Sequence, residues 1–118
     1  MTSETPRTLV TTHVLDLISG FPAPGMNVSL TDMHGVKLCE ASTNNDGRIE
    51  YWGSDMSLPV GVYRMTFDVA GYRHSLVGQQ DPDFFPQIDL VFNLRGDRER
   101  VHIPVLLSAY GYTTYRGS

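Results

Sequence analysis

The stretch "RVHIPVLLS", residues 100–108, decides the fold class. Successive side chains of an extended chain point to opposite faces, so alternate residues share a face. One face of this stretch is then apolar and carries Val101, Ile103, Val105 and Leu107. The opposite face carries Arg100, His102, Pro104 and Leu106. The alternation predicts a β-strand that is buried on one side, with His102 pointing away from the core.

A second stretch near the start, "TLVTTHVLDL" (8–17), has the same pattern. Val10 and Val14 indicate its core side, and Ile18 is expected to continue that side just beyond the strand. The outward face then carries Thr11, His13, Leu15 and Leu17. Both strands therefore present outward faces that are part polar and part apolar. An exposed apolar strip of this kind indicates a subunit interface.

Turn signals recur at short intervals along the whole chain, and short runs rich in β-branched and aromatic residues lie between them. The expected strands are 8–17, 26–33, 36–42, 48–52, 61–69, 86–94, 100–108 and 112–116. "NNDGR" (44–48) is the best hairpin signal, because Asn-Gly and Asp-Gly turns accept positive φ. "GYRHSLVGQQ" (71–80) lacks alternation and is interpreted as a short helix. Short strands with regular turns are typical of an all-β sandwich or barrel.

Composition limits the possible classes of protein. The 118 residues suffice for one domain spanning 1–118, of which 1–7 are expected to be flexible. The net charge of −4 argues against nucleic-acid binding. No apolar run is long enough to predict a membrane span. The single cysteine, Cys39, allows no internal disulfide and is interpreted as a packing residue. With neither a secretory nor a peroxisomal signal in the sequence, the expected location is the cytoplasm.

Few residues suggest chemistry by position alone. His34 and His74 are expected on the surface, and a surface role is also the plainer interpretation of His13, His102, Arg48 and Arg116. No His-x-x-x-His, Cys-x-x-Cys, nucleophile elbow, phosphate loop or dinucleotide fingerprint occurs. A zinc site could form only from His13 and His102 together or across subunits. Neither a metal nor a cofactor is therefore expected.

Several blocks nevertheless resemble the 5-hydroxyisourate hydrolases, the transthyretin-related enzymes of urate degradation. These blocks are "TTHVLDLISGFPAPGMNVSL" (11–30), "NNDGRI" (44–49), "GVYRMTFDV" (61–69), "FFPQIDLVF" (84–92) and "HIPVLLSAYGYTTYRGS" (102–118). They occur in the family's order and cover nearly the whole chain. The closing Tyr-Arg-Gly-Ser is the most specific, because transthyretin, the hormone carrier on the same fold, lacks it.

The resemblance implies a transthyretin-like β-sandwich of about eight strands in two sheets with one short helix. It also implies a homotetramer, a dimer of dimers, with sites at the dimer–dimer interface. The implied catalytic residues are His13, Arg48 and His102, and the implied substrate-binding residues are Tyr115, Arg116, Gly117 and Ser118. Arg100 departs from the family, which often has histidine there, so neither a supporting histidine nor metal binding by a histidine pair is expected at that position. Ala109 replaces a common proline.

The activity implied is hydrolysis of 5-hydroxyisourate to 2-oxo-4-hydroxy-4-carboxy-5-ureidoimidazoline. A histidine would activate water, and an arginine would stabilise the oxyanion. The chain is expected to stop at Ser118 because its end lines the site. Two alternatives remain at this point. One is a non-enzymatic, transthyretin-like carrier of a small molecule, and the other is a structural or adhesion sandwich.

Overall fold

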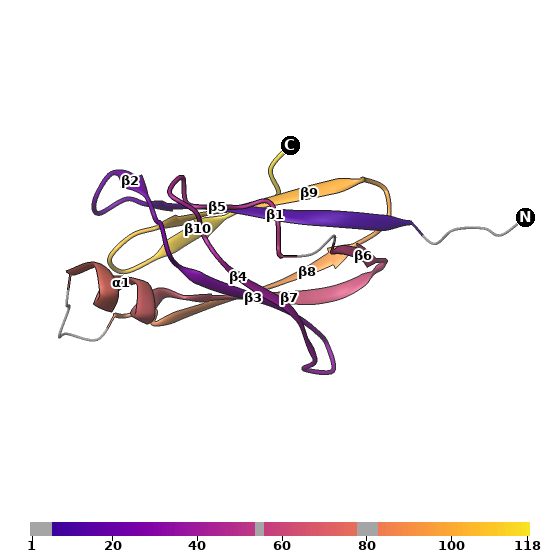
Figure 1. Cartoon of the computed structure of the whole chain (residues 1–118), viewed down its shortest axis with the longest axis horizontal. Helices are drawn as coiled ribbons and strands as arrows, with labels where there is room; N and C mark the ends of the chain where they lie inside the picture. Colours follow the sequence, from indigo (N-terminus) through magenta and orange to yellow (C-terminus); the bar gives the residue numbers. More distant parts are fainter. Residues whose placement is uncertain (1–5, 54–55, 78–82) are drawn as a thin grey trace, which may run out of the picture.

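The computed structural model describes residues 6–53, 56–77 and 83–118. Within them the chain forms two packed β-sheets with a helix, α1 (Val69–Val77), at one end (Figure 1). The first sheet contains β1 (Arg7–Asp16), β2 (Phe21–Pro22), β5 (Arg48–Ile49), β6 (Ser57–Pro59), β9 (Arg100–Leu107) and β10 (Tyr112–Thr114). The second contains β3 (Asn27–Asp32), β4 (Lys37–Ser42), β7 (Gly61–Asp68) and β8 (Gln87–Leu94).

Strand β1 organises the first sheet. Along one edge it pairs in parallel with β9, which pairs in turn with the antiparallel β10. Along its other edge it meets β6, β5 and β2 one after another, all antiparallel. The second sheet has the strand order β4-β3-β7-β8, with antiparallel neighbours throughout. The face of the first sheet that is turned away from the second is called the outer face below.

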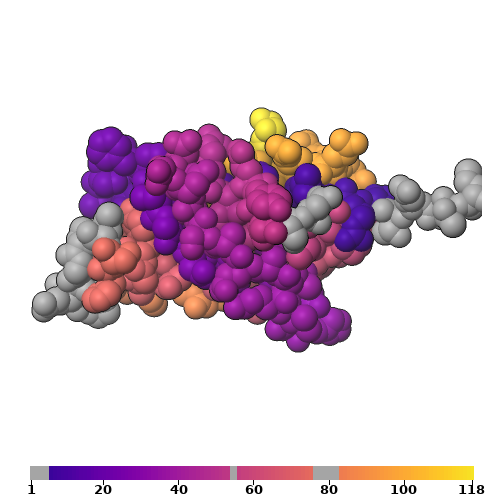
Figure 2. Space-filling view, viewed as in Figure 1, coloured from indigo at the N-terminus to yellow at the C-terminus, as the bar shows by residue number. Residues whose placement is uncertain are grey.

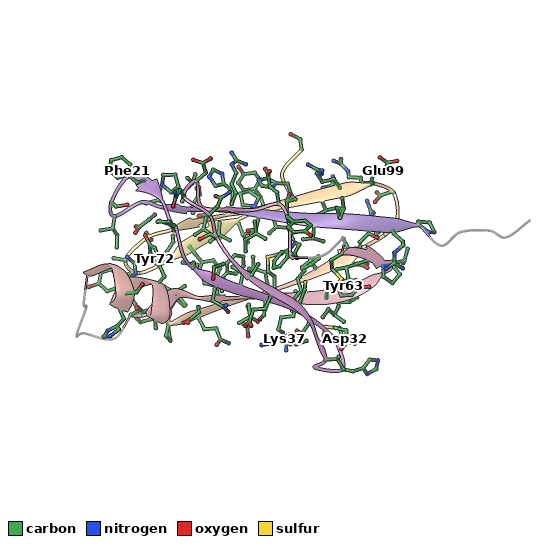
Figure 3. All side chains as sticks on the ribbon, in the orientation of Figure 1. Phe21, Asp32, Lys37, Tyr63, Tyr72 and Glu99 are labelled. Atoms are coloured by element: carbon green, nitrogen blue, oxygen red, sulfur yellow. The ribbon has the colours of Figure 1, made fainter. Side chains whose placement is uncertain are left out.

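The core lies between the two sheets, where apolar side chains from both layers meet. Figure 3 shows side chains filling this space, with Tyr72 towards the helix end and Tyr63 towards the opposite end. The largest fully buried side chains include Phe67, Met65 and Leu30. Burial of a side chain of this size stabilises the fold by about 1.5–3 kcal/mol. Trp52 is also buried, and its indole Nε1–H donates a hydrogen bond to the Val10 carbonyl oxygen at 2.8 Å.

A buried polar network ties the helix to the first sheet. The Tyr72 hydroxyl donates to the Asp16 carboxylate at 2.8 Å, and both side chains are buried. Arg73 donates to the Ser108 carbonyl at 3.1 Å and forms an ion pair with Asp83 at 2.9 Å. Buried charges need such partners, because an uncompensated charge in the interior is strongly destabilising.

The predicted all-β sandwich with one short helix is confirmed, and all eight expected strands are present. Two strands were not predicted, β2 and β6. The strand expected at 48–52 ends at Ile49, and that expected at 112–116 ends at Thr114. The helix expected at 71–80 spans Val69–Val77, and residues 78–80 lie outside the described residues.

Two more local predictions were wrong. Ile18 is 58% exposed, because β1 ends at Asp16 and the chain turns there. "NNDGR" forms a turn but not a hairpin, since β4 and β5 belong to different sheets. Of the segment expected to be flexible, residues 1–5 lie outside the described residues, and Arg7 begins β1 with hydrogen bonds to Ser57. In the described part of the chain, no helix is both long and apolar enough to cross a membrane.

Candidate active site

The strand register brings His13, Arg48 and His102 to the same face of the first sheet. His13 on β1 lies directly opposite Arg48 on β5. Two residues earlier on β1, Thr11 lies opposite His102 on β9. Residues two apart on a strand share a face, and so do cross-strand partners. The two imidazoles and the guanidinium therefore project from three adjacent strands onto the outer face, where all three residues are half-buried.

The "NNDGR" turn places Arg48 beside His13. The Asn44 side chain accepts hydrogen bonds from the backbone N–H groups of Asp46 and Arg48, at 2.9 and 3.0 Å. Gly47 has a φ of +74°, and its carbonyl accepts from the Val14 N–H at 2.7 Å. A Cβ on Gly47 would collide with the Val14 carbonyl oxygen. Glycine accepts the positive φ and leaves room for the Val14 carbonyl oxygen, so the turn can pack closely against β1.

The C-terminal segment packs against His102. The Gly117 N–H donates to the His102 carbonyl at 2.7 Å and forms an isolated β-bridge. A Cβ added to Gly117 would lie 2.9 Å from the His102 Cδ2 atom, which is too close for a carbon contact. Figure 1 shows this segment rising from the outer side of the first sheet, and in Figure 2 its atoms protrude there in yellow. Residue 117 therefore lies next to the ring and has no room for a side chain on that side.

Thr11 is a contact residue that the sequence did not single out. Its hydroxyl lies 2.8 Å from Nδ1 of His102, and Thr11 itself is only 4% exposed. The alternation placed Thr11 on the outward face beside His13 but gave it no role. The contact depends on the parallel pairing of two strands that lie 91 residues apart in sequence, which no local pattern reveals.

The surroundings lower the pKa of both histidines below the ordinary value of 6.5. For His13 the largest cause of the lowered pKa is desolvation, followed by the positive charge of Arg48. The opposing influences are a hydrogen bond with the Asp46 backbone and the negative charges of Asp46 and Glu50. For His102 the causes are desolvation, then Arg48 and His13, with Glu50 opposing. The lowered pKa favours the neutral form of both rings, the form that can accept a proton.

Tyr115 and Arg116 lie beside a different feature. They line a cavity of about 380 Å³ together with residues of β8, such as Phe92, and with Val101 and Ile103 of β9. Val101 and Ile103 lie on the core-facing side of the first sheet, whereas His13 on β1 and His102 on β9 project from its outer face. The structure thus brings His13, Arg48, His102 and Gly117 together and places Tyr115 and Arg116 beside a separate cavity. Ser118 follows Gly117 and is exposed.

The remaining histidines and the cysteine lie elsewhere. His34 and His74 are exposed, and Cys39 packs against the core, as expected for each. Burial raises the pKa of the Cys39 thiol to about 11. Among the described residues, no group of three or more His, Cys, Asp or Glu side chains is arranged to hold a metal ion.

Known proteins are similar to this chain in sequence and in architecture. The chain is 38% identical to the 5-hydroxyisourate hydrolase of Deinococcus radiodurans over 92% of its own length and 95% of that protein. The solved 5-hydroxyisourate hydrolase of Klebsiella pneumoniae superposes with a TM-score of 0.81 at 32% identity, covering 94% and 99% of the two chains. Transthyretin from Sparus aurata superposes with a TM-score of 0.80 at 24% identity, covering 94% and 97%, which shows the common fold. A sequence model described as "HIUase/Transthyretin family" matches residues 10–117, and the chain belongs to this family.

Proposed function

We propose that this protein hydrolyses 5-hydroxyisourate in urate degradation and that His13, Arg48 and His102 carry out the reaction. The observation that carries the proposal is the convergence of these three side chains on one face, fixed by the register of β1 with β5 and β9. The names of the relatives supply the substrate. In the reaction a water oxygen bonds to a ring carbonyl carbon, the acyl–nitrogen bond breaks, and the leaving nitrogen takes a proton.

The two histidines supply the proton acceptor and the proton donor. A neutral imidazole can take a proton from water as it attacks, and the resulting imidazolium can return one to the leaving nitrogen. Both rings have a lowered pKa, which favours the neutral form that a base requires. We assign the base to His102, whose ring is held between Thr11 and Gly117. His13, one row away on the same face, then holds the water or protonates the nitrogen.

Arg48 supplies positive charge where the reaction develops negative charge. A guanidinium stays protonated and presents a planar set of donors, which suits a carbonyl oxygen that is becoming an oxyanion. Arg48 lies opposite His13 and acts electrostatically on both histidines. It therefore lies close to the place where a ring carbonyl would sit during attack by water.

The outer face needs a second wall to enclose a substrate, and we assign that wall to another copy of the chain. The proposed particle is a homotetramer, a dimer of dimers, with sites between the dimers. On the outer face, apolar side chains continue beyond the histidines, with Leu15 and Leu106 half-buried and Leu17 exposed. Such a strip supports an interface between copies. The single unpaired cysteine supports a reducing compartment such as the cytoplasm.

The C-terminal residues Tyr115, Arg116, Gly117 and Ser118 complete the proposed site. Gly117 already contacts the His102 ring. Tyr115 and Arg116 line the separate cavity beside β8, so their assignment to substrate binding requires both side chains to turn towards the outer face. The positive charge of Arg116 suits a readily ionised heterocycle. Deletion of residues 115–118 should therefore lower turnover far more than it lowers the free energy of unfolding.

The direct test uses substrate made in place by urate oxidase acting on urate. Added protein should accelerate the loss of the ultraviolet absorbance of 5-hydroxyisourate over its spontaneous decay. His102→Ala and Arg48→Ala should each lower turnover by roughly 100-fold or more. His34→Ala and Arg98→Ala, which alter exposed side chains away from the site, serve as matched controls. No acceleration by the unmodified chain would exclude the enzyme and leave the carrier alternative.

A further inference from the structure

The His102 ring is held by different neighbours at its two sides. The two ring atoms bonded to Cγ are Nδ1 and Cδ2, and they point in different directions. Nδ1 lies 2.8 Å from the Thr11 hydroxyl. Cδ2 faces the backbone of Gly117, where an added Cβ would lie only 2.9 Å from it. One side of the ring thus has a polar partner, and the other meets tightly packed backbone.

A half-turn of the ring about its Cβ–Cγ bond would reverse this match. The rotation exchanges Nδ1 with Cδ2 and also Nε2 with Cε1. The Thr11 hydroxyl would then face a C–H group and lose its hydrogen bond with the ring. Thr11 is almost fully buried, so its hydroxyl would be left without that partner, which is unfavourable. The surroundings therefore distinguish the two orientations of the ring.

We propose that Thr11 is a positioning residue that selects the ring orientation of His102 and so places Nε2 as the reactive nitrogen. The inference rests on the proposed function for its catalytic consequence. With Nδ1 engaged by Thr11, Nε2 is the nitrogen left for water or substrate. In the flipped orientation a carbon would occupy that position, and a carbon cannot accept the proton.

The neighbouring charges do not replace this contact. Arg48 on β5, His13 on β1 and Glu50 after β5 act on His102 electrostatically. Arg100 lies two residues away on the same strand, and Arg116 precedes Gly117 in the C-terminal segment. Arg48, His13 and Glu50 influence whether the ring is charged. Thr11 is the group within hydrogen-bond distance of one particular ring nitrogen.

The kinetic test compares three variants. Thr11→Val keeps the β-branched shape and removes the hydroxyl. One neutral hydrogen bond gives a bias of about 3- to 10-fold between the two orientations, so its loss should lower the working fraction from roughly 75–90% to about half, and kcat should fall by up to about twofold. KM should stay unchanged, because substrate contacts are kept. Thr11→Ser restores the hydroxyl and should recover most of kcat. Thr12→Val is the matched control, since that buried hydroxyl donates to the Ile103 carbonyl at 2.7 Å.

A spectroscopic test needs no turnover. Imidazole ¹⁵N signals of the substrate-free protein, assigned with a His102→Ala variant, should show a changed His102 in Thr11→Val and an unchanged one in Thr12→Val. This measurement separates the two proposals: full activity of His102→Ala would refute the assigned base, whereas the spectra would still test the positioning. Unchanged His102 signals in Thr11→Val would overturn the inference. An equal loss of kcat in both valine variants, or no recovery in Thr11→Ser, would also overturn it.

Discussion

Replacing Gly117 with alanine should impair turnover without unfolding the protein. The new Cβ would lie 2.9 Å from the His102 Cδ2 atom and 3.3 Å from the His102 carbonyl oxygen. Carbon atoms pack at about 3.5–4.0 Å, so the ring or the C-terminal segment must move by at least about 0.6 Å. A misplacement of about 1 Å can cost about 100-fold in rate, so a shift of about 0.6 Å corresponds to a loss of roughly 10- to 20-fold.

Stability should change little, because residue 117 follows the last strand and is only half-buried. We expect the free energy of unfolding to stay within about 0.5 kcal/mol of the original value, as for most surface substitutions. Turnover is followed by the ultraviolet absorbance of 5-hydroxyisourate, and stability by urea denaturation.

Gly111→Ala provides the matched control for this experiment. Its Cβ would meet no atom closer than the Ser108 Oγ at 3.6 Å, an ordinary contact. It should therefore keep turnover within about twofold, since nothing has to move. Full activity of Gly117→Ala would refute the close packing of the C-terminal segment against His102. A similar loss in both alanine variants would show that the effect is not specific to this contact.

Two further predictions concern acidity and the buried network. Burial lowers the pKa of His13 and His102 below 6.5, so activity should persist into mildly acidic solution. The acid limb of the pH–rate profile should then have its midpoint below 6.5. A midpoint above 6.5 would contradict the assignment of a neutral histidine as the base. The unfolded chain binds these protons at the ordinary pKa, so stability should fall as the pH drops from 6.5 through the lowered values. Tyr72→Phe removes a donor to the buried Asp16 carboxylate and should cost about 1.5–3 kcal/mol in urea denaturation. Tyr63→Phe removes a bond to a neutral carbonyl and should cost only about 0.5–1.5 kcal/mol, so equal losses would argue against a charge-assisted bond.

Alternation in two stretches was enough to predict which faces of β1 and β9 are buried. Val10, Val14 and Val105 are buried, and His13 and His102 lie on the outer face, as the period of two requires. The pattern failed where the strand stopped. Ile18 was expected to continue the core side, but the turn after Asp16 interrupts the period.

Local turn chemistry could be predicted, but membership of a sheet could not. Asn44 and Gly47 form the turn that their sequence indicates. The strands on either side of the turn are β4 and β5. They do not pair with each other, because β5 pairs with β1 and β4 belongs to the second sheet. Strands β2 and β6 have two and three residues, which is too short for a period to be visible.

The candidate site was predicted from family likeness rather than from residue patterns. A histidine in mid-strand is more often a surface residue, so position alone did not favour His13 or His102. The contact between Thr11 and His102 could not be predicted, since it requires the register of two strands from opposite ends of the chain.

The parallel pairing of β1 with β9 has a consequence for biosynthesis. The ribosome releases β1 first, but its principal partner emerges some 90 residues later. Until then one edge of β1 has no partner, and an exposed edge can pair with other chains. Closing so long a loop is entropically costly, which slows folding. The pairing of β1 with β9 should therefore be a late step in the folding of each chain, and assembly of copies into an active particle would follow it.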